Sequence, residues 1–133
     1  MARVQSAFLC QSLLFNDTGT FSALGIGISR FHVPSLPSVI SFMAVAVVKW
    51  DRAEVERDHL AMFRVSIEDE TIARTTLTAP ALPWRDHIGS GTDFAQGLTF
   101  DARRAGHYAV TVSIDGEELE RLPLEVTSEL PAF

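Results

Sequence analysis

The residues best suited to chemistry lie close together in one segment, residues 80–93. Within it Asp86, His87 and Ser90 supply an acid, a base and a hydroxyl, the groups that a serine hydrolase uses. A working triad needs separate elements that converge in space and hold these groups in line beside an oxyanion hole. Neighbouring residues of one loop do not meet that need, and residues 89–91 lack the G-x-S-x-G nucleophile elbow. We therefore expect no catalytic residues here and predict a polar loop in which Asp86 or Ser90 bonds to backbone.

The same 80–93 loop is the first candidate for ligand binding, because binding residues are common on loops held by a rigid scaffold. The candidate residues are Trp84, Arg85, Asp86, His87 and Ser90. The ring of Trp84 could stack on a sugar, as aromatic side chains do in carbohydrate-binding modules. A core plug or a loop anchor is the favoured role of the two tryptophans, because Trp84 follows a proline and Trp50 ends an apolar run.

The histidines, the acidic clusters and the cysteine do not have the spacing of a metal site. The four histidines lie in separate segments without H-x-H or H-x-x-x-H spacing, and we expect them at exposed or half-exposed loop positions. The acidic clusters at residues 68–70 and 115–118 contain no D-x-D-x-D-G calcium loop. The single Cys10 excludes an intramolecular disulfide and predicts a buried thiol. We therefore predict no bound metal and no cofactor.

The composition is that of one globular domain over residues 1–133. An apolar fraction of 47% with 21% charged residues excludes intrinsic disorder. The formal charge of −6 argues against nucleic-acid binding, which needs a basic face. The apolar run at residues 40–48 is half as long as the roughly 20 residues that span a membrane. We predict a cytoplasmic protein without nucleic-acid or membrane contacts, and its many arginines against a single lysine suit a GC-rich bacterial genome.

The elements that must position these residues are strands separated by frequent turn signals, the pattern of an all-β protein. Asp115-Gly116 is the strongest hairpin signal, and Asp51 with Glu54 has the spacing of a helix N-cap within residues 51–58. The predicted strands cover residues 4–15, 20–31, 39–50, 59–67, 72–79, 94–100, 108–114 and 118–126. We predict an antiparallel two-sheet sandwich of about seven to eight strands with at most one short helical turn. A closed or partly open barrel is the second choice.

One strand entry near the C-terminus has the order D…G-x-Y-x-V. Asp101 precedes the run from Gly106 through Tyr108 to Val110. This order is similar to the strand entry of immunoglobulin-like sandwiches. The resemblance implies that Tyr108 is a corner tyrosine, whose hydroxyl bonds back to nearby backbone. Val110 stands where those domains have a cysteine, which suits an intracellular sandwich without an inter-sheet disulfide.

The order of motifs along the whole chain carries a second resemblance. The chain opens with an apolar strand that holds Leu9-Cys10, followed by a turn at residues 17–19 and a glycine-bearing strand at residues 22–27. It closes with G-x-Y-x-V-x-V at residues 106–112 and the hairpin at residues 115–116. In this order it resembles a family of small bacterial proteins of unknown function, although its first turn is one residue shorter than theirs. The resemblance supports the fold and implies no activity, cofactor or partner.

Two strands of the N-terminal half are apolar on both faces, unlike the alternating strands of the C-terminal half. Residues 8–15 and 40–48 carry large apolar side chains at both even and odd positions. A two-sheet sandwich buries one face of each sheet, so the second face needs a cover from residues 51–58, from the 80–93 loop or from another chain. Because two-fold dimers are the commonest homo-oligomers, we predict a homodimer that pairs through this sheet. The candidate interface residues are Met43, Val45 and Val47.

Together these observations favour a non-catalytic structural or protein-interaction module that acts through a sheet face or a loop. Its partner is a second copy or an unidentified protein. The alternative is a small-ligand or carbohydrate-binding β-sandwich that uses the 80–93 loop. A hydrolase built on Asp86, His87 and Ser90 ranks third, and we predict that the protein is not an enzyme.

Overall fold

Most of the described chain is in β-strands. The computed structural model describes residues 2–15, 21–55, 57–80, 83–86 and 89–129. In these ranges it contains ten strands and one short 3-10 helix, η1 (Arg52–Glu54). The strands are β1 (Arg3–Cys10), β2 (Ser12–Phe15), β3 (Phe21–Leu24), β4 (Arg30–Val33), β5 (Ser38–Trp50), β6 (Asp58–Ile67), β7 (Glu70–Pro80), β8 (Ser90–Ala102), β9 (Gly106–Ile114) and β10 (Glu117–Ser128). The prediction of an all-β protein with at most one short helical turn is confirmed.

The long strands β5 and β8 belong to a three-stranded antiparallel sheet with the order β1-β5-β8. Their register is continuous from the Ser38–Ala102 pair to the Trp50–Ser90 pair. Every second residue of β5 from Ile40 to Trp50 is buried, because successive side chains of a strand point to opposite faces.

The remaining long strands form a five-stranded sheet with the order β4-β10-β9-β6-β7. Its pairs are antiparallel except that β4 runs parallel to β10. The predicted hairpin at Asp115-Gly116 joins β9 to β10, and both residues have the positive φ that a tight hairpin turn requires. The predicted hairpin of residues 59–79 is also present, as β6 and β7.

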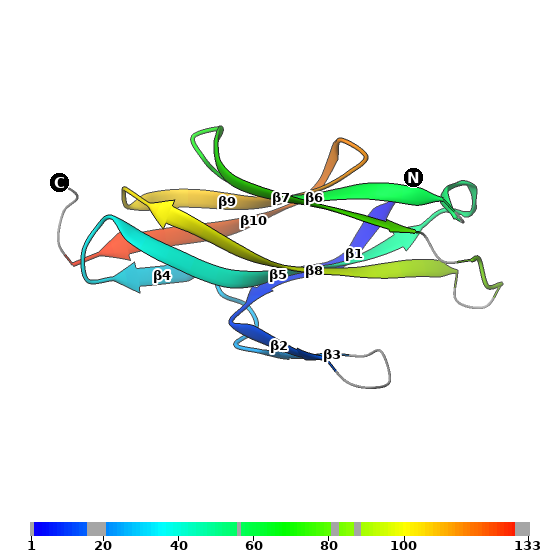
Figure 1. The fold of residues 1–133 in the computed structure, drawn as a ribbon, viewed down its shortest axis with the longest axis horizontal. Coiled ribbons are helices and arrows are strands. Elements are labelled where there is room, and N and C mark those ends of the chain that lie inside the picture. The colour runs from blue at the N-terminus through cyan, green and yellow to red at the C-terminus, as the bar shows by residue number, and fades with distance from the viewer. Residues whose placement is uncertain (1, 16–20, 56, 81–82, 87–88, 130–133) are drawn as a thin grey trace.

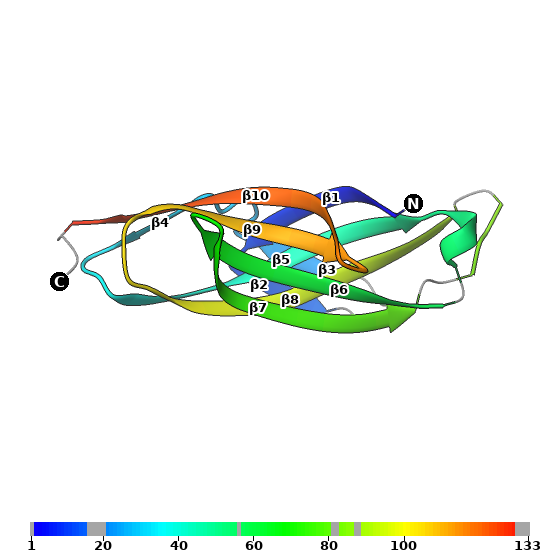
Figure 2. The same cartoon turned by 90° about the horizontal axis from the view of Figure 1, so that it is seen from above.

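The three-stranded and five-stranded sheets face each other, and the apolar core lies between them (Figures 1 and 2). Trp50 at the end of β5 is 3% exposed and stacks on the ring of His59 from β6, with ring centroids 4.2 Å apart. The Trp50 indole N–H donates to the Thr92 hydroxyl at 2.8 Å. Trp50 is therefore a core plug, as the sequence predicted.

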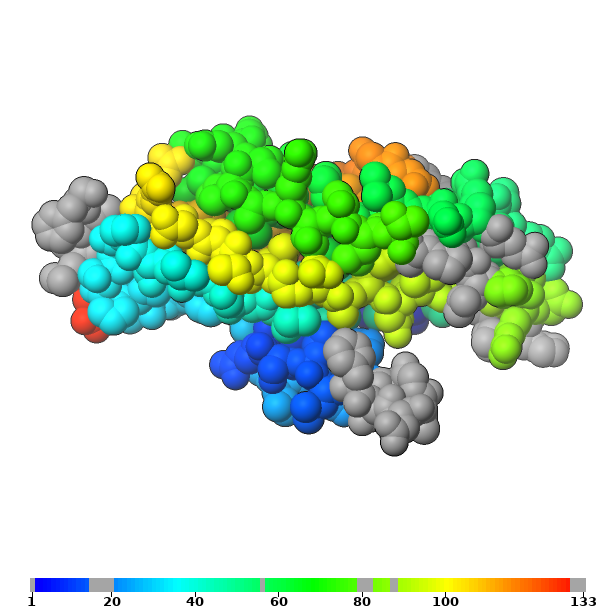
Figure 3. All heavy atoms as spheres, viewed as in Figure 1, coloured from blue at the N-terminus to red at the C-terminus, as the bar shows by residue number. Residues whose placement is uncertain are grey.

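The two short strands β2 and β3 form a separate hairpin that projects from the outer face of the three-stranded sheet (Figures 1 and 3). The sequence predicted single strands over residues 4–15 and 20–31, and both are wrong in length, because each is divided in two. The predicted arrangement of two sheets with seven to eight strands is therefore corrected to three sheets with ten strands in the described ranges.

Backbone contacts around Gln11 explain why the first strand ends where it does. The Gln11 N–H donates to the carbonyl of Leu24, so the chain leaves β5 and pairs with β3 instead. Beyond β3, the N–H groups of Gly27 and Ile28 donate to the carbonyl of Leu9. Gly25 at φ 68° allows this turn, and an added Cβ there would lie 2.6 Å from the Gln11 Cγ.

The helical turn predicted within residues 51–58 is η1, and its contacts place a histidine in the core. The Glu54 carboxylate accepts the N–H groups of Asp51 and Ala2, both at 2.9 Å. The Glu54 carbonyl oxygen lies 2.7 Å from His59 Nε2, and an Asp115 carboxylate oxygen lies 2.7 Å from His59 Nδ1. His59 is 1% exposed, so the expectation of an exposed loop histidine is wrong at this position.

Candidate functional site

The loop between β7 and β8 is closed by its own backbone. Within its described residues, Arg85 and Gly89 exchange two hydrogen bonds: the Arg85 N–H donates at 3.1 Å, and the Gly89 N–H donates at 2.6 Å. Gly89 has a φ of 72°, which favours glycine at this position. The bridge sets the chain direction immediately before Ser90 begins β8. The Arg85–Gly89 bridge thus lies directly at the end of the three-stranded sheet.

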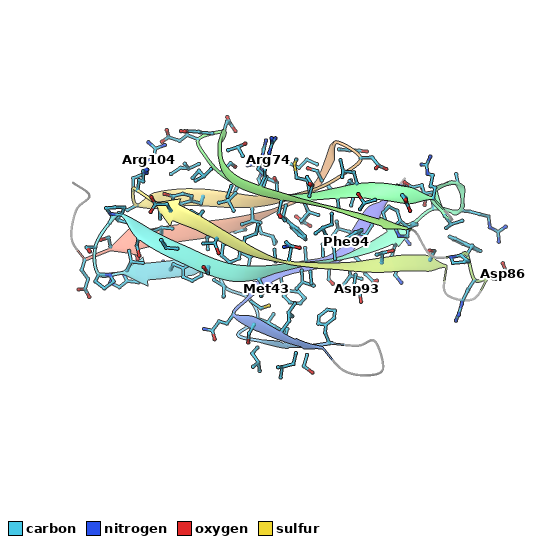
Figure 4. The ribbon with its side chains drawn as sticks, viewed as in Figure 1. Met43, Arg74, Asp86, Asp93, Phe94 and Arg104 are labelled. Atoms are coloured by element: carbon cyan, nitrogen blue, oxygen red, sulfur yellow. The ribbon has the colours of Figure 1, made fainter. Side chains whose placement is uncertain are left out.

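Side-chain contacts from η1 also hold the loop. The Arg52 guanidinium lies 2.9 Å from an Asp86 carboxylate oxygen and 5.2 Å from the ring centre of Trp84. Asp86 lies at the far end of the molecule from the Arg104 turn (Figure 4). Trp84 remains 36% exposed, so the contact leaves a good part of its surface open to solvent. Trp84 is therefore a loop anchor, with an exposed surface that a ligand could reach.

A hollow of about 470 Å³ lies beside this loop, on the outer face of β5 and β8. Its lining residues are Val47, Lys49, Pro83, Arg85, Gly89, Ser90, Gly91 and Asp93, and we call it the β5–β8 hollow. Figure 4 shows Asp93 pointing outward from this sheet, whereas the neighbouring Phe94 points into the core. The volume lies within the range of small-ligand sites, about 300–1,000 Å³.

The charged groups of the β5–β8 hollow are not neutralised within the described part of the chain. Lys49, Arg85 and Asp93 make no ion pair with a described residue. The Lys49 side chain lies close over Gly91, since an added Cβ there would be 3.2 Å from Lys49 Nζ and from the Val48 carbonyl oxygen, which is tighter than an ordinary contact. Two cationic groups, one carboxylate and apolar Val47 could therefore contact a polar ligand directly.

The predicted loop residues have different environments. Arg85 and Ser90 line the hollow, and Ser90 is 4% exposed. Trp84 and Asp86 contact Arg52 instead. His87 lies outside the described residues. Sequence reasoning missed Lys49 and Asp93, because strand pairing alone brings their two strands together beside the loop.

The three candidate interface residues lie on the outer face of β5, beneath or beside the β2–β3 hairpin. Met43 points toward the hairpin (Figure 4), Val45 has no exposed surface, and Val47 lines the β5–β8 hollow. The hairpin is thus a cover from the same chain, and it is none of the three covers that the sequence suggested. A second copy would meet the hairpin before it met Val45.

The hairpin presents apolar side chains to solvent on its own outer face. Cross-strand pairing places Ser12 and Leu14 of β2 on the same face as Ser22 and Leu24 of β3. Leu14 is 58% exposed and Leu24 is 53% exposed, whereas Leu13 and Ala23 on the opposite face are half-buried. Large apolar side chains on a projecting element are typical of an interaction surface.

Three further features bear on the predicted absence of a cofactor, a metal and a membrane span. Cys10 is buried, and burial raises the pKa of its thiol. Within the described ranges, no group of three or more metal-ligating side chains is placed to hold an ion. The helical content of those ranges is the single turn of η1, so no helix there has the length and hydrophobicity of a membrane span.

Comparisons with known proteins find a family and a shared fold. The model of a family described as a family of unknown function (DUF6941) matches residues 5–127. No curated protein matches the chain. Among solved structures, "Crystal structure of the C-terminal domain of wzt" is similar with a TM-score of 0.59 at 12% sequence identity. That match covers 99% of this chain and 77% of the other. At this identity the similarity shows the fold alone, that of a β-rich domain.

Proposed function

We propose that this chain, which belongs to the DUF6941 family of unknown function, is a non-catalytic protein-interaction module. The observation that carries the proposal is the outer face of the β2–β3 hairpin, where Leu14 and Leu24 are each more than half exposed. The bacterial origin, the cytoplasmic location and the immunoglobulin-like topology stay predictions.

The proposed partner at the hairpin is a second copy of the chain. The sequence from residue 11 to residue 28 has one charged side chain, that of Asp17, whereas the whole chain has a formal charge of −6. Two copies that meet through strands β2 and β3, which carry no charged residue, avoid much of the like-charge repulsion that a more acidic surface would produce. A two-fold axis would also place the same apolar residues on both sides of the interface.

Light scattering during size-exclusion chromatography tests this proposal. We expect the wild-type chain to have the mass of a dimer at micromolar concentration, and Leu14→Glu with Leu24→Glu to have the mass of a monomer. The control is Leu60→Glu, because Leu60 is 49% exposed on β6 of the opposite sheet. A monomeric wild-type chain, or dissociation by Leu60→Glu as well, would overturn the proposal.

The alternative function is small-ligand or carbohydrate binding at the β5–β8 hollow and its loop. The charges of Lys49, Arg85 and Asp93, which no described residue neutralises, favour it, together with the exposed ring of Trp84. The two tryptophans provide a test, because Trp84 is exposed and Trp50 is 3% exposed. A bound ligand should change the fluorescence of Trp84 while that of Trp50 stays constant.

A glycan array tests this alternative function. Each sugar that binds the protein on the array is then titrated while the tryptophan fluorescence is recorded. We expect Lys49→Gln with Asp93→Asn to abolish the titration, and Trp84→Phe to remove the fluorescence change. Arg103→Gln is the control, because Arg103 lies on the turn between β8 and β9. Equal binding by the wild-type and the Lys49, Asp93 double variant would exclude the hollow as the site.

A further inference from the structure

Three arginines form a row across the outer face of the five-stranded sheet. Strand pairing sets Arg64 of β6 directly opposite Arg74 of β7. On its other side Arg64 faces Thr111 of β9, which faces Arg121 of β10. Directly paired side chains share a face, with Cβ atoms about 4.5–5.5 Å apart. We call Arg64, Arg74, Thr111 and Arg121 the arginine row.

Two of these arginines have no acidic partner among the residues that the structure describes. Arg121 lies 3.0 Å from the Glu118 carboxylate. Among the described residues neither Arg64 nor Arg74 has such a partner, and the buried Nε of Arg64 has no hydrogen-bond partner. Like charges directly opposite each other on a sheet destabilise it. A buried donor without a partner is also rare in native proteins, so the Arg64 Nε has a hydrogen-bonding capacity that the described residues leave unused.

The surroundings of the row strengthen any interaction with an anion. Thr111 is 1% exposed although it lies on an outward face, because long side chains of the row flank it on both sides. Arg64 itself is half-buried. Its guanidinium is therefore partly withdrawn from water, where a charge interaction is screened less than on an open surface. Figure 4 shows Arg74 pointing outward from the same sheet.

We propose that Arg64 and Arg74 bind the oxyanion of a small ligand, a carboxylate or a phosphate group. Guanidinium groups match the planar geometry of these anions and bind them through paired hydrogen bonds. A bound oxyanion would relieve the repulsion between the two arginines. The ligand's remaining part lies over a neighbouring hollow of about 470 Å³, whose lining includes Ser66, Ala109, Arg121 and Pro123.

The same face argues for a single small anion and against a nucleic acid. The exposed carboxylates of Glu68 and Asp69 also line the neighbouring hollow, and Glu118 lies beside Arg121. A polyanionic backbone would meet these acids as well as the arginines, on a chain with a formal charge of −6. The arginine row lies on the sheet opposite the β2–β3 hairpin, so this inference is independent of the proposed dimer.

Nuclear magnetic resonance titration tests the proposal with two probes, potassium phosphate and potassium glutarate, against potassium chloride at equal ionic strength. The Nε of Arg64 is buried, so we expect its N–H to exchange slowly enough with water to give a signal, which its loss in Arg64→Gln would assign. We expect phosphate or glutarate to shift this signal at concentrations where chloride does not. The probe that binds more tightly identifies the oxyanion.

Arg74→Gln should weaken the binding by at least about tenfold, since a hydrogen bond to a charged group is lost. Arg74 is exposed, so the variant should fold normally. Arg103→Gln is the matched control, because Arg103 is exposed and pairs with Asp101 away from the row. If neither oxyanion shifts the signal beyond the chloride effect, or if Arg74→Gln binds as tightly as wild type, the proposal is wrong.

Discussion

Tyr108 has a buried side chain whose hydroxyl donates to the Arg104 carbonyl at 2.6 Å, across the turn between β8 and β9. Tyr108→Phe removes this donor and leaves the carbonyl without it, so we expect a loss of about 0.5–1.5 kcal/mol in the free energy of unfolding. Urea unfolding measures it. Thr99→Val is the control, because the Thr99 hydroxyl bonds to Ser41 on the exposed surface at 2.9 Å. If Tyr108→Phe and Thr99→Val lost the same free energy of unfolding, the Tyr108 hydrogen bond would stabilise the fold no more than an exposed one.

The sequence identified some of the important residues and missed others for a physical reason. Tyr108 was found because its bond is local, with a partner four positions away. Lys49 and Asp93 were missed because each looks like an ordinary solvent-facing strand residue. They line one hollow because β5 pairs with β8 across a long stretch of sequence, and the sequence alone does not give that pairing.

Gly25 determines the course of the chain between the β2–β3 hairpin and β4. Gly25→Ala would require a side chain at φ 68° and a Cβ 2.6 Å from Gln11, so we expect a loss of about 1–2 kcal/mol in the free energy of unfolding. Gly97→Ala is the control, because the new Cβ would lie 3.5 Å from the Met43 sulfur in ordinary contact. Urea unfolding of both variants provides the measurement. Equal stability of Gly25→Ala and wild type would mean that the turn adapts without cost.

At the scale of elements, the hairpins were predictable and the boundary near Gln11 was not. The β6–β7 and β9–β10 hairpins combine alternating apolar residues with turn residues between them, so two local signals agree. Residues 4–15 contain no glycine or proline to mark an end. The division between β1 and β2 depends on the hydrogen bond from the Gln11 N–H to the Leu24 carbonyl, and no local sequence pattern predicts that bond. The arginine row is likewise a product of register across four strands.

Acid should weaken the whole molecule through Asp115, which ties the β9–β10 turn to β6. The hydrogen bond with His59 and the N–H of Leu60 hold the pKa of Asp115 below its ordinary value of 3.8. A carboxylate with a lowered pKa stabilises the fold above its unfolded pKa, and this contribution is lost as the pH falls through the folded pKa. The free energy of unfolding should therefore fall as the pH drops below about 4.

Asp115→Asn provides the comparison, because asparagine also tolerates the positive φ of this position. We expect the variant to be less stable than wild type at pH 7, with a smaller difference at pH 3. Urea unfolding at the two pH values measures it. If wild type and Asp115→Asn differed in free energy of unfolding by the same amount at pH 7 and pH 3, the charge of Asp115 would not contribute to stability.

The parallel pairing of β4 with β10 determines when β4 can fold during synthesis of the chain. His32 and Thr127 lie 95 positions apart, yet their side chains meet at 2.8 Å. Within the described chain β4 has β10 as its strand neighbour, so β4 cannot pair until β10 has been synthesised. Distant pairings of this kind slow folding and prolong the exposure of apolar segments. We therefore expect β4, unlike β1 to β3, to stay unpaired and accessible to chaperones until β10 has been made.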